Sequence, residues 1–389
     1  MPVPEGAYRR EPIFHLIFSL PTLFVIGRFL WPLHIPFVMK GGVAVLLLIA
    51  SQYHLWSRLS SGSVFSPEFP RAIVIGFNWA FGAILLLAVF QLLLDAGTLV
   101  TMIVRRGGMS IPDGARYAIA AVAAVLAAVG VHQAIRVPPV KDVEIHIAGL
   151  DTAFDGYTML QLTDLHISRL FPQGWAQAVV DQSNALAPDL IVVTGDFIDG
   201  TVEARRDDVE PLRDLRAQDG TLFIPGNHEY FFGYQDWMRH LSGMGMHLLA
   251  NEHTVLQRNG GKLVIAGVTD LSAPETGNIA PDLTSALRNA PTGVPAILLD
   301  HQPKNARNAA SRGVALQLSG HTHGGMIMGL DRLAALANAG FVSGRYDVDG
   351  MTLYVNNGTA LWAGFALRLG RPSELTRITL RKQAAQTSS

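Results

Sequence analysis

Residues 158–166 read Thr-Met-Leu-Gln-Leu-Thr-Asp-Leu-His, so an apolar run ends directly in Asp164 and His166. Short apolar runs bounded by polar and turn residues are typical of buried strands. The same arrangement recurs after residues 190–194, 221–224, 296–299 and 315–318, with the blocks Gly195-Asp196-Phe197-Ile198-Asp199, Gly226-Asn227-His228-Glu229, Asp300-His301-Gln302-Pro303 and Gly320-His321-Thr322-His323-Gly324-Gly325. Because open α/β folds bind ligands at the carboxyl ends of their strands, the five blocks are predicted to converge at one sheet edge.

Helical and strand patterns alternate around these blocks. Helices are expected at residues 173–186 and 210–216, between the first three strands. Further strands are expected at residues 263–266, 351–355 and 375–380. This order predicts an α/β sandwich with more than one sheet.

Composition divides the chain of 389 residues into two parts. Hydrophobic residues make up 49% and charged residues 16%, which is unusual for a wholly soluble protein. The apolar excess lies between residues 13 and 135, whereas charged residues are frequent after residue 140. The fold class predicted is therefore an α-helical transmembrane region followed by an α/β domain. The net charge of -1 shows no basic excess that would suggest a nucleic-acid partner, and no protein partner can be inferred. The absence of cysteine excludes thiolate ligands and a cysteine nucleophile.

Four apolar stretches, at residues 13–31, 37–56, 72–94 and 117–133, are close to the ~20 residues that a membrane-spanning helix needs. A cleaved signal peptide would explain only one of them. Residues 96–104 either extend the third helix or lie at the membrane interface. We therefore expect a multi-pass region of about four helices over residues 1–136, a Pro-containing linker over 137–142, a catalytic domain over 143–381 and a disordered tail over 382–389.

Basic residues indicate the orientation of these spans. With four spans, one side carries Arg9, Arg10, Arg58, Arg71, Arg136 and Lys141, and the other carries Lys40, Arg105, Arg106 and Arg116. The positive-inside rule then places the protein in the inner membrane with a cytoplasmic catalytic domain. A fifth span or a re-entrant segment would reverse this orientation.

The polar blocks carry the residue types that a pair of metal ions requires. Asp-x-His offers one oxygen and one imidazole, and the aspartate of Gly-Asp-x-x-Asp can bridge two cations. A mixed set of oxygen and nitrogen donors suits manganese, iron, cobalt or zinc better than calcium. Two such ions can activate a water and hold the oxygens of a phosphoryl group during its displacement. The pattern therefore predicts hydrolysis without a protein nucleophile.

On these five blocks the chain resembles the calcineurin-like metallophosphoesterases over roughly residues 143–380. The phrases Leu-Thr-Asp-Leu-His, Gly-His-Thr-His-Gly-Gly and Leu-Tyr-Val-Asn-Asn-Gly, followed by Arg368-Leu-Gly-Arg-Pro, are similar to the membrane-associated, bacterial phosphodiesterase-like branch. The resemblance implies a four-layer α/β/β/α sandwich. It also implies a metal-dependent phosphoric ester hydrolase holding two divalent ions, with manganese, iron or zinc expected.

The resemblance also implies roles for particular residues. Asp164, His166 and His323 would bind the first metal, and Asn227, His301 and His321 the second, with Asp196 bridging them. His228 would donate a proton to the leaving oxygen, and Asp199 would orient it. Glu229 is not a ligand in the family pattern, so a local hydrogen bond is expected for it.

One part of the chain departs from that branch. Met326 follows the double glycine where the branch often has glutamine, and residues 329–340 are apolar where it has a more polar loop. Two interpretations remain open for residues 326–341. The loop could pack on the membrane or on an acyl chain, or it could form a helix packed on the domain's own core.

These observations leave more than one hypothesis for function. The first is a membrane-anchored phosphodiesterase or pyrophosphatase in which a metal-bridging hydroxide attacks a lipid-linked substrate. A UDP-2,3-diacylglucosamine-type hydrolase of lipid A biosynthesis is one candidate that the resemblance implies. The alternatives are a hydrolase of a soluble phosphodiester or nucleotide, and a non-catalytic, metal-binding membrane sensor or scaffold. The partners expected are a phosphate-ester substrate and membrane lipids.

Overall fold

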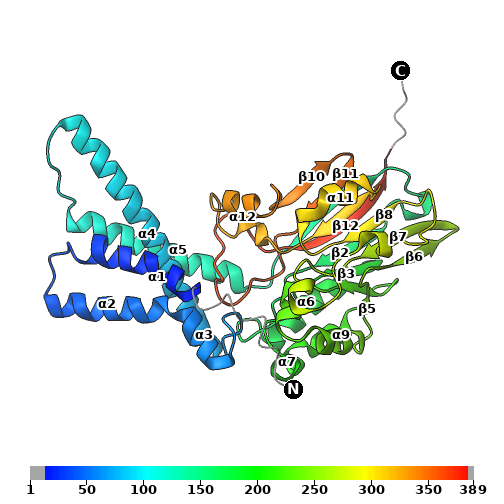
Figure 1. The fold of residues 1–389 in the computed structure, drawn as a ribbon, viewed down its shortest axis with the longest axis horizontal. Helices are drawn as coiled ribbons and strands as arrows, with labels where there is room; N and C mark the ends of the chain where they lie inside the picture. Colours follow the sequence, from blue (N-terminus) through cyan, green and yellow to red (C-terminus); the bar gives the residue numbers. More distant parts are fainter. Residues whose placement is uncertain (1–13, 384–389) are drawn as a thin grey trace. The chain divides into compact units, whose positions relative to one another are not determined.

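The computed structural model describes residues 14–383, which form two compact units (Figure 1). The first, here called the helical unit, contains the described residues up to Ile135 together with the distant segment Trp362–Leu369. The second, here called the two-sheet domain, contains Arg136–Leu361 and the chain from Gly370 onward. Ile13, Arg9 and Arg10 lie outside the described residues, as do residues 384–389 of the expected tail.

The described part of the helical unit contains five α-helices. These are α1 (Phe14–Val25, continued by a π-helical turn over Ile26–Leu30), α2 (Phe37–Ser51), α3 (Tyr53–Ser61), α4 (Arg71–Arg105) and α5 (Asp113–Ile135). Within the described residues, α4 and α5 are each long and apolar enough to cross a membrane, and α2 with α3, bent by 50°, could form one further span. The apolar helix near the first expected span covers only Ser19–Leu30, so the count of four stays a prediction. Residues 96–104 continue α4.

Large apolar side chains on these helices lie on the surface of the unit. Exposed examples on α4 are Leu92, Leu93, Ile103 and Val104, and α5 exposes Val125. A soluble monomer rarely exposes apolar side chains at this density. A helix whose outer face is apolar is instead stable in lipid, because its backbone hydrogen bonds are satisfied internally.

The segment Trp362–Leu369 is bound into the helical unit by polar contacts. In α4, Asn78 donates a hydrogen bond to the Ala363 carbonyl over 2.9 Å and accepts one from the Ala366 amide over 2.6 Å. Tyr53 also donates to the Ala363 carbonyl, over 2.7 Å. Buried backbone groups that lack a partner are costly, so these side chains allow irregular chain to lie among apolar helices.

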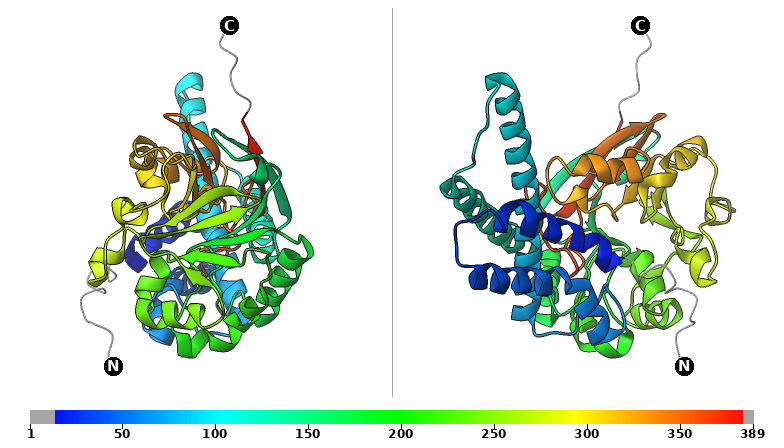
Figure 2. Two further views of the ribbon diagram at one scale, coloured as in Figure 1. Left: turned by 90° about the vertical axis from the view of Figure 1, so that its right-hand side faces the viewer. Right: turned by 60° about the vertical axis from the view of Figure 1, so that its left-hand side comes forward.

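The two-sheet domain contains two six-stranded sheets (Figure 2). The first has the order β1-β12-β2-β3-β4-β5 and the second β10-β11-β9-β8-β7-β6. In the first sheet β2, β3, β4 and β5 are parallel, and in the second β7, β8, β9 and β11 are parallel. The strands are β1 (Val140–Ile147), β2 (Thr158–Leu162), β3 (Leu190–Thr194), β4 (Thr221–Ile224), β5 (His247–Leu248), β6 (Glu252–Arg258), β7 (Gly261–Gly267), β8 (Ala296–Leu299), β9 (Leu316–Ser319), β10 (Gly344–Val348), β11 (Met351–Val355) and β12 (Leu375–Lys382).

The main core lies between the two sheets. Alternate residues along each strand point into it, as the period of two requires, for example Leu190 and Val192 from β3 and Ile297 and Leu299 from β8. The intervening residues of β3 are buried as well, which explains why its sequence is apolar throughout rather than alternating. A second apolar cluster packs the other face of the second sheet against α10 (Leu283–Ala286) and α11 (Ala306–Ser311).

Further helices of this domain lie outside the space between the two sheets (Figure 1). They are α6 (Gln173–Ala185), α7 (Val202–Val209), α8 (Asn227–Phe231), α9 (Tyr234–Ser242), α10 (Leu283–Ala286), α11 (Ala306–Ser311) and α12 (Asp331–Ala337). The predicted fold class, apolar helices followed by a layered α/β/β/α domain, is confirmed. The helix predicted at residues 210–216 is confirmed only in part: residues 210–214 form a 3₁₀ helix, and it continues an α-helix that begins at Val202 and is capped by Thr201.

Candidate metal centre

The five polar blocks converge where β2, β3, β4, β8 and β9 end. Seven predicted residues form three overlapping groups, in each of which the candidate ligand atoms lie within 4.8 Å of one another. The groups are Asp164 with His166 and His323, Asp196 with His301 and His321, and His166 with Asp196 and His228. Asn227 and Asp199 join them through hydrogen bonds, so all nine predicted residues lie together.

The first group surrounds Asp164. Its Oδ1 lies 3.9 Å from His166 Nε2 and 3.7 Å from His323 Nε2. These separations are too long for hydrogen bonds. They are compatible with the separation between two ligand atoms that each lie about 2.0–2.2 Å from one shared ion. Thr163 donates a hydrogen bond to the same carboxylate over 2.9 Å, which fixes its orientation.

The second group surrounds the side chain of Asn227. Its amide oxygen lies 3.1 Å from His301 Nε2 and 2.9 Å from His321 Nδ1. His301 Nδ1 donates to the Thr194 carbonyl over 2.7 Å, so Nε2 is the nitrogen that faces the cluster. His301 Nε2 also lies 3.3 Å from Asp196 Oδ2. Backbone and side-chain partners therefore orient both histidines before any ion binds.

The backbone that presents these side chains is unusual. Five of the seven predicted ligands have a positive φ: Asp164 (52°), His166 (42°), Asp196 (56°), His321 (68°) and His323 (50°). Such a conformation costs a residue other than glycine on the order of 1–3 kcal/mol. These residues follow β2, β3 and β9, where the left-handed backbone breaks the side-to-side alternation of a strand. Strain concentrated at these positions is typical of a functional site.

Glu229 has a role that the sequence did not show. One carboxylate oxygen accepts hydrogen bonds from the amides of Gly226 (2.6 Å) and Asp196 (3.0 Å), and the other accepts from Phe197 (2.8 Å). The bond to Gly226 is the expected local one, but the other two hold the loop that carries Asp196. The position of Glu229 in the sequence signals only the local bond to Gly226, since a glutamate at the third residue of a helix often accepts from the backbone before it.

The site carries an excess of buried negative charge. Burial raises the pKa of Asp164, and the charge of Asp196 raises it further. Burial likewise raises the pKa of Glu229 to about 7, again with a contribution from Asp196. For Asp196 itself, burial acts in the same direction, but the neighbouring His301 and His228 outweigh it and hold the pKa well below its usual range. Cations at this position would compensate the carboxylates.

The histidines respond to the same charges. Burial opposes protonation of His228, yet Asp196 and Asp199 raise its pKa to about 9. Burial and the charge of His301 lower the pKa of His321 to about 3, so His321 is neutral and able to act as a ligand.

A buried imidazole nitrogen that lacks a hydrogen-bond partner indicates whether these residues fit a metal ion. His166 is fully buried, its Nδ1 donates to Asp199, and its Nε2 has no hydrogen-bond partner. An orphaned nitrogen aimed at Asp164 and Asp196 is what an imidazole awaiting an ion presents. The residues therefore fit a dinuclear site, without selecting a particular metal.

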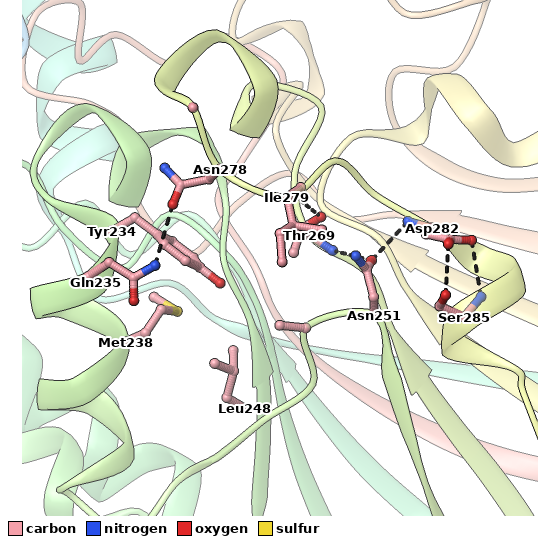
Figure 3. A pocket seen from close by; sticks show the side chains of 12 residues that line it. Tyr234, Gln235, Met238, Leu248, Asn251, Thr269, Asn278, Ile279, Asp282 and Ser285 are labelled. Carbon is pink, nitrogen blue, oxygen red and sulfur yellow. Dashed lines mark hydrogen bonds between the residues drawn. The ribbon is translucent and has the colours of Figure 1, made fainter.

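A cavity of about 480 Å³ lies elsewhere in the domain, between α9, β5 and the loop around Ile279 (Figure 3). None of the nine site residues lines it. Its polar groups bond to one another: Asn251 accepts from the amides of Thr269 and Asp282, and Gln235 donates to Asn278. The cavity is thus separate from the metal centre and offers few unused polar groups.

Comparison with known proteins identifies the domain. Residues 157–325 match the family model described as calcineurin-like phosphoesterase. An uncharacterized metallophosphoesterase of Bacillus subtilis, YkuE, is 33% identical over 236 residues, which are 59% of this chain and 80% of that protein. An uncharacterized metallophosphoesterase of Helicobacter pylori is 33% identical over 253 residues, which are 64% of this chain and 66% of that protein.

The chain is also similar to a relative whose name describes it as a transmembrane protein. The zebrafish "transmembrane protein with metallophosphoesterase domain" is 35% identical over 273 residues, which are 67% of this chain and 61% of that protein. The chain thus spans slightly less than two thirds of the length of this relative and of the Helicobacter one. The matched region, the two-sheet fold and the His/Asp centre agree, and the chain belongs to the calcineurin-like metallophosphoesterase family.

Proposed function

We propose that the chain is a membrane-anchored, dinuclear-metal phosphoesterase that hydrolyses phosphodiester or pyrophosphate bonds. Asp164, His166 and His323 would hold one ion, Asn227, His301 and His321 the other, and Asp196 both. When bound, two such ions supply Lewis acidity toward phosphoryl oxygens and lower the pKa of a water. The observation that carries the proposal is the buried convergence of these donors, with His166 Nε2 left without a partner.

In this proposal, protein side chains would protonate the leaving group. His228 Nδ1 lies 2.6 Å from Asp199 Oδ1, which turns Nε2 of the same ring toward the cluster, 4.0 Å from Asp196 Oδ2. The raised pKa keeps a proton on the ring at neutral pH. In this proposal His228 donates that proton to the leaving oxygen, and Asp199 stabilises the resulting orientation.

Turnover separates this proposal from a non-catalytic metal sensor. The purified full chain with Mn²⁺ should hydrolyse a bis-aryl phosphate diester. Asp196→Ala should lose both metal and turnover, whereas His228→Ala should retain metal and lose turnover. His146→Ala, an exposed residue of β1, is the matched control. Metal binding by the unaltered chain without turnover of any phosphate ester would contradict the enzyme and favour the sensor.

The substrate is proposed to be lipid-linked. Support comes from the apolar helices α4 and α5, which belong to the same chain as the metal centre. A soluble phosphodiester or nucleotide is the competing substrate class. Turnover of a lipid-linked pyrophosphate should exceed that of its water-soluble analogue, and a preference for the soluble analogue would contradict the lipid proposal.

We also propose that the helices lie in an inner membrane and that the two-sheet domain faces the cytoplasm. This orientation is based on the larger number of basic residues on the domain's side of the predicted spans. A reporter fused after Ser389 tests this orientation, and a periplasmic signal would contradict it.

A further inference from the structure

Helix α12 exposes its apolar side chains. Among the described residues of the two-sheet domain, large apolar side chains are exposed only at Ile279 and in one short stretch. That stretch contains Met328 (68% exposed), Leu330 (46%), Leu333 (64%) and Leu336 (82%). The helix itself buries no residue, so the interpretation of a helix packed on the domain's own core is wrong for its leucines.

The exposed residues share one face of the helix. Leu330, Leu333 and Leu336 recur at intervals of three, which keeps them on one side of an α-helix. The other side is held to the domain: Asp331 forms an ion pair with Arg371 and accepts a hydrogen bond from Gly329 over 2.8 Å. Because these contacts fix the opposite side of the helix to the domain, the leucine side chains point away from the domain.

Helix α12 is close in sequence to the metal-centre block, and a residue just before it pairs with the chain that follows the segment Trp362–Leu369. It follows the block that carries His321 and His323 by a few residues. Ile327, at the start of the exposed stretch, forms an antiparallel bridge with Gly370. Gly370 directly follows Leu369, the last residue of the segment that belongs to the helical unit.

We propose that the leucine face of α12, with Met328, docks in the interfacial region of a lipid bilayer beside the metal centre. Apolar side chains on an interfacial helix enter the boundary between headgroups and acyl chains, and the exposed Arg332 among them suits anionic headgroups. The inference rests on the proposed membrane anchoring and extends it, since it assigns these residues to contact with the lipid from which a substrate would be drawn.

Because the chain contains no cysteine, a single probe can be placed on this face. Leu336→Cys, labelled with a fluorophore, is reconstituted as the full chain in nanodiscs of phosphatidylcholine and phosphatidylglycerol. The matched control is Asn308→Cys on α11, which also follows a metal-ligand block but carries exposed Arg307 and Asn308. Nitroxide lipids report contact with the bilayer, and iodide reports contact with water.

If this face docks in the bilayer, nitroxide lipids should quench the fluorophore at position 336 at least twofold more strongly than at position 308. Iodide should quench the fluorophore at position 308 more strongly than at position 336. Equal iodide quenching at both positions would overturn the proposal, as would shielding of position 336 from both quenchers, which indicates a protein partner. Aryl diester turnover by the unaltered chain is measured separately. Its failure counts against the proposed enzyme, whereas missing lipid quenching counts against the docking face.

Discussion

One carboxylate oxygen of Asp199 lies 2.6 Å from His228 Nδ1 and 3.0 Å from His166 Nδ1. It therefore orients both the proposed proton donor and a proposed metal ligand. The Nε2 atoms of both rings face Asp196, at 4.0 Å and 3.7 Å. In the proposed function, a single buried acid would therefore couple proton donation to metal binding.

Asp199→Asn should lower both kcat and metal affinity, because the neutral amide holds the two imidazoles less well and its NH₂ group is a donor where they need an acceptor. We expect a loss of about 100-fold or more in kcat and of about 10- to 100-fold in metal affinity. Turnover at saturating Mn²⁺ and metal titration measure the two effects. Asp236→Asn, an exposed carboxylate of α9, should change neither. Unchanged kcat in Asp199→Asn would refute the coupling.

Gly226→Ala should disrupt the centre without unfolding the domain. A Cβ at Gly226 would collide with Oδ1 and the amide of Asp196. Displacement of Asp196, the proposed bridging ligand, should reduce turnover by about 100-fold, since small misplacements of reacting groups are costly. The control is Gly174→Ala in α6, where a Cβ meets no atom within 4 Å. Equal turnover by both variants would contradict this reading of the contact.

Removing metal should destabilise the two-sheet domain. The buried carboxylates repel one another, so an ion that binds only the folded state stabilises it by about 2.7 kcal/mol at a concentration of 100 Kd. Thermal unfolding of the full chain, with EDTA and then with increasing Mn²⁺, should show a rising Tm. Asp196→Ala should abolish this rise, and a rise of the same size in that variant would argue against the assigned site.

Asp300 should make the metal-free protein less stable as pH rises. Burial, with the charge of Asp270, raises its pKa to about 8, well above that of an unfolded aspartate. The folded state therefore favours the protonated acid, and the stability present below about pH 4 is lost between about pH 4 and pH 8.

Asp300→Asn, measured by urea unfolding in EDTA, should remove this dependence and gain on the order of 1 kcal/mol or more at about pH 8. The same pH slope in the variant and the unaltered chain would exclude Asp300 as its source.

Asn78→Leu should loosen the segment Trp362–Leu369. The substitution removes the hydrogen bonds to Ala363 and Ala366, and a buried group left without its partner costs about 1–3 kcal/mol. Limited proteolysis in detergent should then cut within this segment faster than in the unaltered chain. Asn338→Leu, whose side chain bonds within α12, should leave that cleavage rate unchanged.

Much of the site could be predicted because its information is local. Each ligand follows a strand within a few residues, and parallel strands place their carboxyl ends at one edge, so order along the chain implies proximity. The roles of Glu229 and of the second Asp199 contact could not be predicted. Each depends on a hydrogen bond between loops that are adjacent only after the sheet has formed.

The sequence by itself determined the apolar region, the strands of the parallel sheets and the set of donor residues, because periodicity and residue chemistry are properties of short stretches. Only the tertiary structure decided which side chains are buried or exposed. The residues of segment Trp362–Leu369 look like ordinary domain sequence, yet Asn78, 285 positions from Ala363, holds them in the helical unit. The leucines of α12 look like core residues, yet no element of the described domain covers them. Burial depends on neighbours that long-range packing supplies, and no local pattern encodes those neighbours.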